Sequence, residues 1–482
     1  MNQARWRIVA ATGALTLLLA LPAGLIAQGT PAIAGNPNLE RYGAAIEQAR
    51  MLMREVTSRS GAPGWSVAVG HQGQVVWAEG FGFADLELNV PVSTLTRFRI
   101  GSVSKPLTAA AVGQLVEQGR LDLDAPVQTY VPSFPEKRWP VTTRSAAGHL
   151  AGIRHYNGDE FLSAERFETV LAGLEIFQDD TLLFEPGTRF SYSSYAWNLV
   201  SAVVEGASGE EFLAYMQRHV FQPLGMDNTV ADHTDSIIPN RTRFYMTTPH
   251  GVLNAPFVDN SYKWAGGGFL STPSDLVRFG MAHFSEELMR RGTIEELWTS
   301  QRTNDDEETE NGIGWFFDVD PNGSRLVQHG GGSIGGTTML MLMPEHGVVV
   351  ALVANGRAST SVGLAWTLAQ FFLAEPTADP VEQLDLAGTF DCSIIRGGEE
   401  VATGELALEG GPGDYWGRIA FQEEEGQDVG EIVRVAGGPD ELHVILVAAG
   451  GSVLNLWLSS AEYGAAGRWM GSSNNGDLEC TR

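Results

Sequence analysis

Two segments far apart in the chain alternate apolar residues with polar or small ones. The first is WSVAVGHQGQVVWAEGFGFAD, residues 65–85, which is interrupted at residues 71–73, His-Gln-Gly. The second is TTMLMLMPEHGVVVALVANG, residues 337–356, which is interrupted at residues 344–347, Pro-Glu-His-Gly. A period of two on either side of a short turn predicts a β-hairpin in each segment. The simplest assembly places both hairpins in one antiparallel sheet.

The chain between these hairpins has mostly a helical period. Residues 104–117 and 194–207 are examples, and further helices are expected at residues 39–58 and 361–374. An antiparallel sheet whose faces are covered by helices, with a helical lobe inserted between the hairpins, accounts for this order of elements. We therefore expect an α/β fold of the α+β type over residues 38–375.

The pattern changes after the last predicted helix. Residues 376–384 follow Glu375 with Pro376 and Pro380 and predict a linker. Residues 385–482 contain short apolar runs such as RIAFQ, EIVRVAG and VLNLWLSS between turn residues, which is typical of a small all-β barrel or sandwich. This pattern is compatible with ligand binding, with capping of a cleft, with assembly and with stabilisation.

The N-terminal residues 1–34 have the layout of a secretory signal peptide. Arg5 and Arg7 precede an apolar run from Ile8 to Leu21, and small residues follow. Cleavage after Ala27 or Ala34 would fit, and the alternative is an uncleaved membrane anchor. We expect an exported protein, periplasmic or secreted, with no membrane span in the mature chain.

Charge and cysteine content indicate which partners and which cellular compartment to expect. The net charge of −27 becomes −29 without residues 1–34, because that segment holds two arginines and no acidic residue. Nucleic acids and anionic lipids are therefore unexpected partners, since both bind clustered basic side chains. The only two cysteines, Cys392 and Cys480, lie near the ends of the C-terminal segment. In an oxidising compartment we expect them to form a structural disulfide.

The strongest chemical motif is Ser102-Val103-Ser104-Lys105 at the start of an amphipathic segment. Residues three apart lie on the same face of a helix, so Ser102 and Lys105 can meet there. Pro106 indicates that the helix begins at or just before Ser102. A lysine acts as a base only when its pKa is lowered by burial or by cationic neighbours. Ser104 is the competing nucleophile, but it points elsewhere on the helix.

Two later segments supply further polar groups. In FEPGTRFSYSSYAWNLV, a short extended run leads to Tyr192 and a helix opens near Ser193 or Ser194. A tyrosine at such a strand-to-helix junction can relay a proton, and Tyr195 is the alternative. In RLVQHGGGSIGG, His329 precedes three glycines on an expected edge strand. Glycines there let a substrate approach the backbone and an N–H group bind its carbonyl oxygen.

These three motifs, in this order, resemble those of the penicillin-binding-protein-like serine hydrolases, which include class C β-lactamases, DD-peptidases and related esterases. The resemblance covers about residues 38–374. It implies that Ser102 attacks a carbonyl carbon, that Lys105 takes the proton and that Tyr192 shares the acid/base work. Ser194 would touch the substrate amide. His329 would replace the usual third-motif lysine.

The resemblance also implies an oxyanion hole formed by the N–H groups of Ser102 and Gly332, with Gly331 beside the substrate. It implies neither a metal ion nor a cofactor. Two departures matter: Ser194 stands where an asparagine is common, and His-Gly-Gly replaces Lys-Thr-Gly. A histidine does not reliably supply the positive charge that grips a β-lactam carboxylate, because its free pKa is near 6.5.

The sequence therefore predicts a serine hydrolase that cleaves a peptide or D-amino-acid peptide bond through an acylated Ser102. A carboxylesterase or a weak β-lactamase using the same site is the alternative within the enzymes. The alternative outside them is a non-catalytic binding protein that retains the fold. The sequence does not distinguish oligomeric states.

Overall fold

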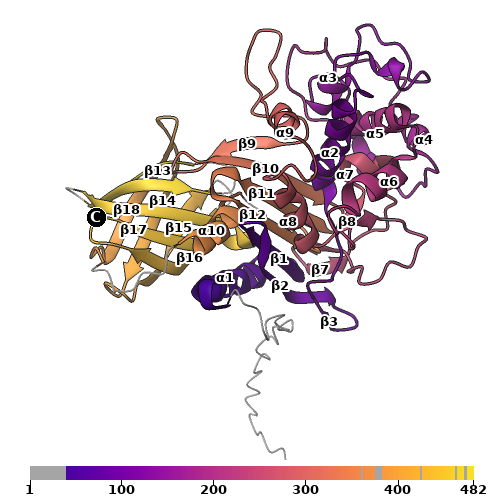
Figure 1. Cartoon of the computed structure of the whole chain (residues 1–482). Helices are drawn as coiled ribbons and strands as arrows, with labels where there is room; N and C mark the ends of the chain where they lie inside the picture. Colours follow the sequence, from indigo (N-terminus) through magenta and orange to yellow (C-terminus); the bar gives the residue numbers. More distant parts are fainter. Residues whose placement is uncertain (1–38, 360–361, 375–382, 424–425, 462–463, 472–474) are drawn as a thin grey trace, which may run out of the picture.

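A seven-stranded antiparallel sheet forms the centre of the N-terminal domain in the computed structural model (Figure 1). The structure describes residues 39–359, 362–374, 383–423, 426–461, 464–471 and 475–482. The strand order is β3-β2-β1-β12-β11-β10-β9. The strands are β1 (Gly64–His71), β2 (Gln74–Asp85), β3 (Val90–Pro91), β9 (Phe316–Val319), β10 (Arg325–Ser333), β11 (Gly336–Met343) and β12 (Val348–Ala354). The two predicted hairpins are β1-β2 and β11-β12, and they are adjacent because β1 pairs with β12.

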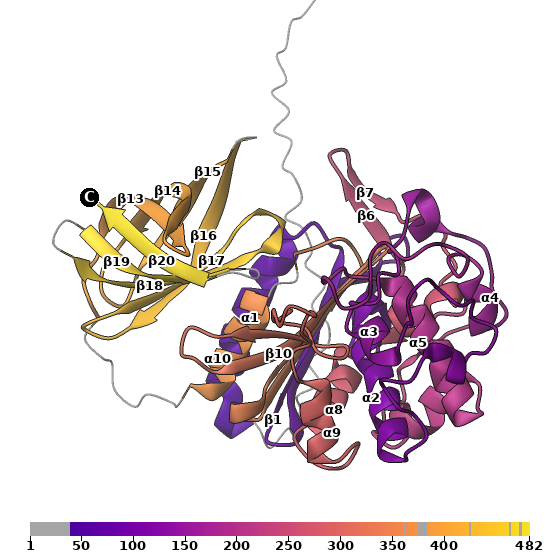
Figure 2. The ribbon, with the colours of Figure 1, turned by 90° about the horizontal axis from the view of Figure 1, so that it is seen from above.

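Successive residues of the central strands face two different layers. On β12, Val350 and Leu352 pack with α1 (Leu39–Arg59) and α10 (Val362–Leu373) on one face. Val349 and Ala351 belong to the core on the other face, which α8 (Pro273–Ala282) covers. Figure 2 shows the helical lobe beyond α8 and the C-terminal domain on the side of α1 and α10. A strand buried on both faces is apolar at every position, as β12 is.

The helical lobe is inserted between β2 and β9. Its longest helices are α2 and α5, and α2 runs through the core with 11 of its residues buried. The helices of the lobe are α2 (Ser104–Glu117), α3 (Thr143–Ala147), α4 (Val170–Leu174), α5 (Ser194–Ser208), α6 (Phe212–Tyr215), α7 (Trp264–Gly267) and α9 (Arg291–Leu297). Two small sheets complete it, formed by β4 (Phe98–Arg99), β8 (Phe269–Ser271) and β5 (Val230–Ala231), and by β6 (Tyr245–Thr248) and β7 (Gly251–Asn254).

The C-terminal domain is a closed antiparallel barrel of eight strands. Its strands are β13 (Gly388–Arg396), β14 (Glu399–Glu409), β15 (Trp416–Glu423), β16 (Gly426–Gly437), β17 (Leu442–Val447), β18 (Val453–Ala461), β19 (Gly464–Met470) and β20 (Asn475–Thr481). β13 pairs with β20 and closes the barrel, with Cys392 opposite Cys480. A disulfide joins these two cysteines across the seam.

The barrel shares a hydrophobic core with the N-terminal domain. Val447, Val453 and Trp457 on the barrel belong to the same buried cluster as α1, α10 and one face of the sheet. The Trp457 ring stacks on that of His443 at 4.7 Å and meets Trp366 of α10 edge-on at 5.4 Å. The barrel is therefore packed onto the N-terminal domain and is not a separate body on a tether.

The structure differs from the sequence prediction at two points near the expected site. Residues Gly101–Val103 form a 3-10 turn, and α2 follows from Ser104. Tyr192 lies in a loop and not at the end of an extended strand. Hydrogen bonds from the N–H groups of Ser191 and Ser193 to His149 hold this loop. The predicted signal peptide and most of the predicted linker lie outside the described residues.

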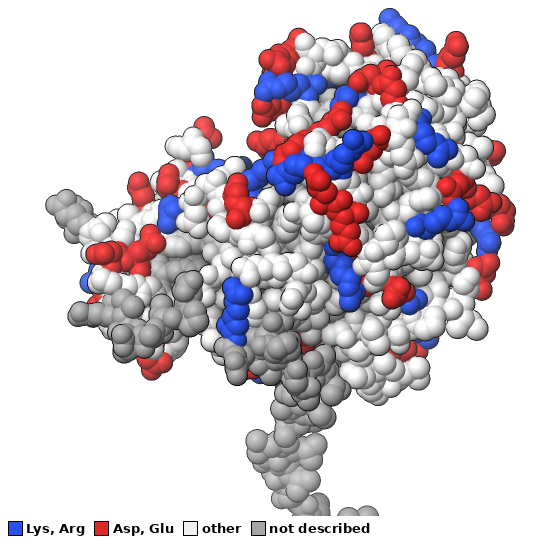
Figure 3. All heavy atoms as spheres, viewed as in Figure 1, with Lys and Arg blue, Asp and Glu red and all other residues white. Residues whose placement is uncertain are grey.

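Charged side chains on the face shown in Figure 3 are mixed, with basic groups beside acidic ones. Several arginines of the chain are paired with carboxylates: Arg144 binds both Asp124 and Glu296, and Arg154 binds Glu160 and Asp180. Within the part of the chain that the structure describes, no helix has the length and apolar character needed to cross a bilayer.

Candidate active site

Ser102 lies in the 3-10 turn that leads from β4 into α2. Gly101 makes this turn possible, because its φ of +49° is a conformation that residues with a side chain rarely adopt. Ser102 is partly exposed and lines a pocket of about 470 Å³. Ser104 is fully buried, and its hydroxyl accepts a hydrogen bond from the Phe269 N–H group at 3.4 Å. Of the two serines in the motif, only Ser102 can meet a substrate.

Lys105 is completely buried beneath Ser102. Its Nζ atom lies 3.0 Å from Ser102 Oγ, 3.1 Å from Ser194 Oγ and 2.7 Å from the carbonyl oxygen of Gly266. Burial and the nearby charge of Lys263 hold the pKa of Lys105 well below its usual value. A neutral amine has two N–H donors and one lone pair, so it can donate to Gly266 and Ser194 and accept the Ser102 proton. The three contacts match this valence.

Tyr192 approaches the same two hydroxyl groups from the loop before α5. His149 holds this loop: its carbonyl accepts the Ser191 N–H, its Nδ1 accepts the Ser193 N–H at 3.0 Å, and its ring stacks on Tyr192 at 4.3 Å. Burial raises the pKa of Tyr192 to about 12, and hydrogen bonding to Ser102 and Ser194 opposes this rise. The phenol is therefore protonated and can donate.

Tyr195 does not take this position. Its ring is fully buried, and its hydroxyl donates to Glu160 Oε2 at 2.9 Å. Burial and the Glu160 carboxylate raise the pKa of Tyr195. Tyr195 therefore belongs to the core of the lobe, and Tyr192 is the tyrosine that faces Ser102.

Ser194 is held in place by a histidine that sequence reasoning missed. The Ser194 N–H donates to Nδ1 of His155 at 3.0 Å, and the His155 side chain lines the pocket. Burial and the charges of Lys105 and Lys263 lower the pKa of His155 to about 4, so the ring is neutral and can accept this bond. His155 stands in a loop 39 residues before Ser194, a separation with no local pattern that could have identified it.

The glycines of β10 form the wall opposite Ser102. Strand β9 pairs with β10 only as far as Gln328, so the next residues of β10 face the 3-10 turn. A Cβ atom on Gly331 would lie 2.1 Å from the carbonyl oxygen of Ile100, and one on Gly101 would lie 2.9 Å from the Gly332 nitrogen. Gly332 and Ser102 both line the pocket. Their N–H groups are thus candidates for one oxyanion hole.

His329 is a buried residue of the same strand, two positions before Gly331. It is 2% exposed and is not among the residues that line the pocket. Its Nδ1–H group donates to the carbonyl oxygen of Gly330 at 2.6 Å, and its ring centroid lies 6.4 Å from that of Tyr192. Burial and the charge of Lys105 lower the pKa of His329 to about 3. The histidine is therefore neutral and supplies no positive charge to a substrate.

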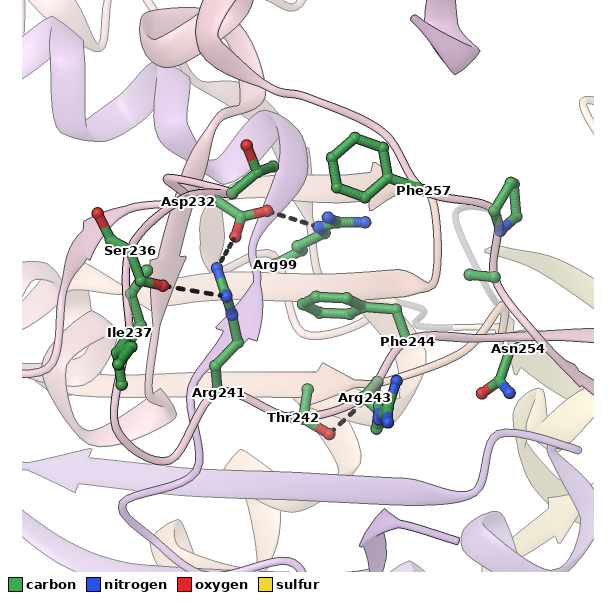
Figure 4. Close-up of a pocket in the computed structure, with 14 residues that line it drawn as sticks. Arg99, Asp232, Ser236, Ile237, Arg241, Thr242, Arg243, Phe244, Asn254 and Phe257 are labelled. Atoms are coloured by element: carbon green, nitrogen blue, oxygen red, sulfur yellow. Dashed lines mark hydrogen bonds and ion pairs between the residues drawn. The ribbon is translucent and has the colours of Figure 1, made fainter. Parts of the chain in front are cut away.

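A second pocket, of about 590 Å³, is drawn in Figure 4. Phe244 lines this pocket and the next residue, Tyr245, lines the one at Ser102. Asp232 binds Arg99 at 2.7 Å and Arg241 at 3.2 Å, and the Arg99 guanidinium lies 3.9 Å over the Phe244 ring. Arg99 is the last residue of β4, so its contacts with Asp232 and Phe244 help to fix the strand that leads to Ser102. Among the described residues, no group of three His, Cys, Asp or Glu side chains could hold a metal ion.

The chain is similar to known proteins in sequence and in fold. The family model described as Beta-lactamase matches residues 47–374. Over 453 residues the chain is 32% identical to the serine beta-lactamase-like protein LACTB, mitochondrial, of Mus musculus, covering 70% of this chain and 82% of that protein. It is 25% identical over 339 residues to a D-aminopeptidase of Brucella anthropi, covering 68% of this chain and 63% of the relative.

Solved structures show the same fold. The octameric penicillin-binding protein homologue from Pyrococcus abyssi superimposes with a TM-score of 0.59 at 22% identity, over 90% of this chain and all of that one. The expected resemblance and fold class are confirmed. With the family model matching more than half of its length, this chain belongs to the beta-lactamase family of serine hydrolases, which also includes penicillin-binding proteins and D-aminopeptidases.

Proposed function

We propose that this hydrolase cleaves the amide bond of a peptide or D-amino-acid peptide through an acyl-enzyme on Ser102. The observation that carries the proposal is the buried Lys105 amine, 3.0 Å from Ser102 Oγ. When the neutral amine donates to its other two partners, Ser194 and Gly266, its lone pair is left for that hydroxyl. The similarity to a D-aminopeptidase supports an amide substrate.

Acylation begins when Ser102 Oγ attacks the carbonyl carbon and its proton passes to Lys105 Nζ. Negative charge then develops on the carbonyl oxygen, where the N–H groups of Ser102 and Gly332 can stabilise it. The proton moves from Lys105 through the Tyr192 hydroxyl to the leaving nitrogen, so that an amine departs. In the second half of the cycle water attacks the ester carbonyl, a proton of that water passes through Lys105 to Ser102 Oγ, and the carboxylic acid product departs.

Lysine is better suited than tyrosine to take the first proton. Burial disfavours the charged form of both groups, but the charged form is the acid for lysine and the base for tyrosine. The lowered pKa of Lys105 makes the neutral base available, whereas a pKa of about 12 for Tyr192 makes the tyrosinate scarce. Tyr192 is therefore assigned to proton relay and not to the initial abstraction.

The experiment is covalent labelling of the purified chain that lacks residues 1–34. An activated p-nitrophenyl ester is expected to add one acyl group to Ser102, located by mass spectrometry of tryptic peptides. The Ser104→Ala variant serves as the matched control and should still be labelled. Labelling that persists in the Ser102→Ala variant would contradict the proposal. A panel of L- and D-peptides then defines the amide substrate, with Ser102→Ala as the blank.

We also propose that the chain is exported. The apolar run of residues 8–21 and the Cys392–Cys480 disulfide both suit an oxidising, extracytoplasmic compartment. Expression in a bacterial host followed by N-terminal mass spectrometry should find a mature end after Ala27 or Ala34 in the periplasmic fraction. Recovery of only unprocessed chain in the cytosol would contradict export.

A further inference from the structure

Lys263 is a buried amine that the proposed mechanism does not use. It ends the 3-10 turn Ser261–Lys263, is 2% exposed and lines the same pocket as Ser102. Among the described residues, no hydrogen-bond partner reaches its Nζ atom. Three aromatic rings surround that atom, with centroids at 4.2 Å for Phe161, 5.0 Å for Tyr262 and 5.5 Å for Tyr156. The rings offset part of the cost of burial but satisfy none of its N–H donors.

Lysine is rare in this chain, which makes the position informative. Of 31 basic residues only three are lysines, at positions 105, 137 and 263. Lys137 binds backbone carbonyl oxygens of Gln178 and Asp180. The other two both lie at the Ser102 pocket, although the chain uses arginine almost everywhere else. A compact amine with free donors is thus placed where a substrate would lie.

The charge of the pocket lining is opposite to that of the protein. The chain has 58 acidic and 31 basic residues, yet no acidic side chain lines this pocket, within the residues described, whereas Lys263 and Arg357 do. His329 and His155 are neutral, and Lys105 must be neutral to act as a base. The lining therefore favours an anionic group.

We propose that the Lys263 ammonium binds a carboxylate of the substrate beside the carbonyl that Ser102 attacks, and so makes the enzyme selective for anionic peptides. This inference rests on the proposed hydrolase function. It assigns the role of carboxylate recognition to a residue of the lobe, because His329 is neutral, buried and outside the pocket lining. Arg357 is available as a second cation at the same pocket.

The surroundings of Lys263 leave its charge available to a ligand. Burial and the positive charge of Arg99 lower the pKa of Lys263 to about 7, and Asp232 opposes this shift. Asp232 is already engaged by Arg99, Arg241 and the Asn260 side chain. Among the other titratable neighbours, Lys105, His155, Tyr156 and Tyr262 carry no negative charge near neutral pH, and the Glu160 carboxylate is already engaged by Arg154 and Tyr195. A bound carboxylate would therefore be the direct partner of this ammonium.

The test uses two p-nitrophenyl esters with the same acyl skeleton, one ending in a carboxylate and the other in a carboxamide. The measured quantity is the ratio of their kcat/KM values, in wild type and in Lys263→Met. Methionine is unbranched and of similar length, so it fills the aromatic surround without charge. Loss of a hydrogen bond to a charged group should lower the ratio by about ten- to a hundredfold. Because Lys263 also influences Lys105, both rates can change, but the ratio cancels that common effect.

Lys137→Met is the matched control and should leave the ratio at its wild-type value. An unchanged ratio in Lys263→Met, or a loss found only in Arg357→Gln, would overturn the assignment. Binding of the intact carboxylate and carboxamide peptides to Ser102→Ala, measured by calorimetry with and without Lys263→Met, separates this inference from the hydrolase proposal. Selective binding that depends on Lys263 supports the inference even where acylation is absent. Equal binding of the two peptides refutes it.

Discussion

The contact between β10 and the Ser102 turn can be tested with two neighbouring glycines. An alanine Cβ at position 331 would lie 2.1 Å from the carbonyl oxygen of Ile100, about 1 Å closer than a carbon–oxygen contact of about 3.3 Å. Backbone cannot rotate away as a flexible side chain can, so β10 must move by about that distance. At position 330 the nearest atom to an added Cβ is the end of the flexible Met339 side chain, at 3.7 Å.

Gly331→Ala should therefore move the Gly332 N–H group away from its position beside the Ser102 N–H group and weaken the oxyanion hole. Losing one such donor, or misplacing it by 1 Å, costs about a hundredfold or more in turnover. The assay is the pre-steady-state burst of p-nitrophenol from an activated ester, with thermal unfolding to confirm the folded state. Gly330→Ala is the control and should retain most of the burst rate. Equal rates in the two folded variants would refute the assignment of this wall to the oxyanion hole.

Three further predictions concern Lys105, Lys263 and the packing of the barrel. Lys105→Met should reduce the acylation rate by about a hundred- to ten-thousandfold, measured by the same burst; a rate near wild type would exclude Lys105 as the base. The KM of the carboxylate ester should rise as the pH increases through about 7, because Lys263 loses its proton there, while the KM of the carboxamide ester stays level; parallel pH profiles would contradict this. Trp457→Ala should lower the free energy of unfolding by about 3 to 5 kcal/mol, because it leaves a cavity in the core shared by the barrel and α10. Calorimetry measures this loss, and an unchanged melting temperature would contradict the prediction.

The sequence alone determined features that depend on local periodicity. The hairpins at β1-β2 and β11-β12 and the helices α2 and α5 follow the predicted ranges, because alternation and helical period are set by neighbouring residues. The meeting of Ser102 with Lys105 belongs to the same class, since one helical turn brings them together. Whether the C-terminal strands form a barrel or a sandwich was open, because both show the same alternation; the pairing of β13 with β20 decided it.

Only the tertiary structure decided which distant groups share the pocket and what charge they carry. Ser194 and Gly266 reach Lys105 across 89 and 161 residues, and no spacing in the chain indicates such contacts. His329 fits the motif by its position on β10, yet burial makes it neutral and leaves it outside the pocket lining. Lys263 shows no pattern in the sequence. Its importance arises from its desolvation beside Ser102, because the electrostatic character of a side chain depends on what surrounds it in space.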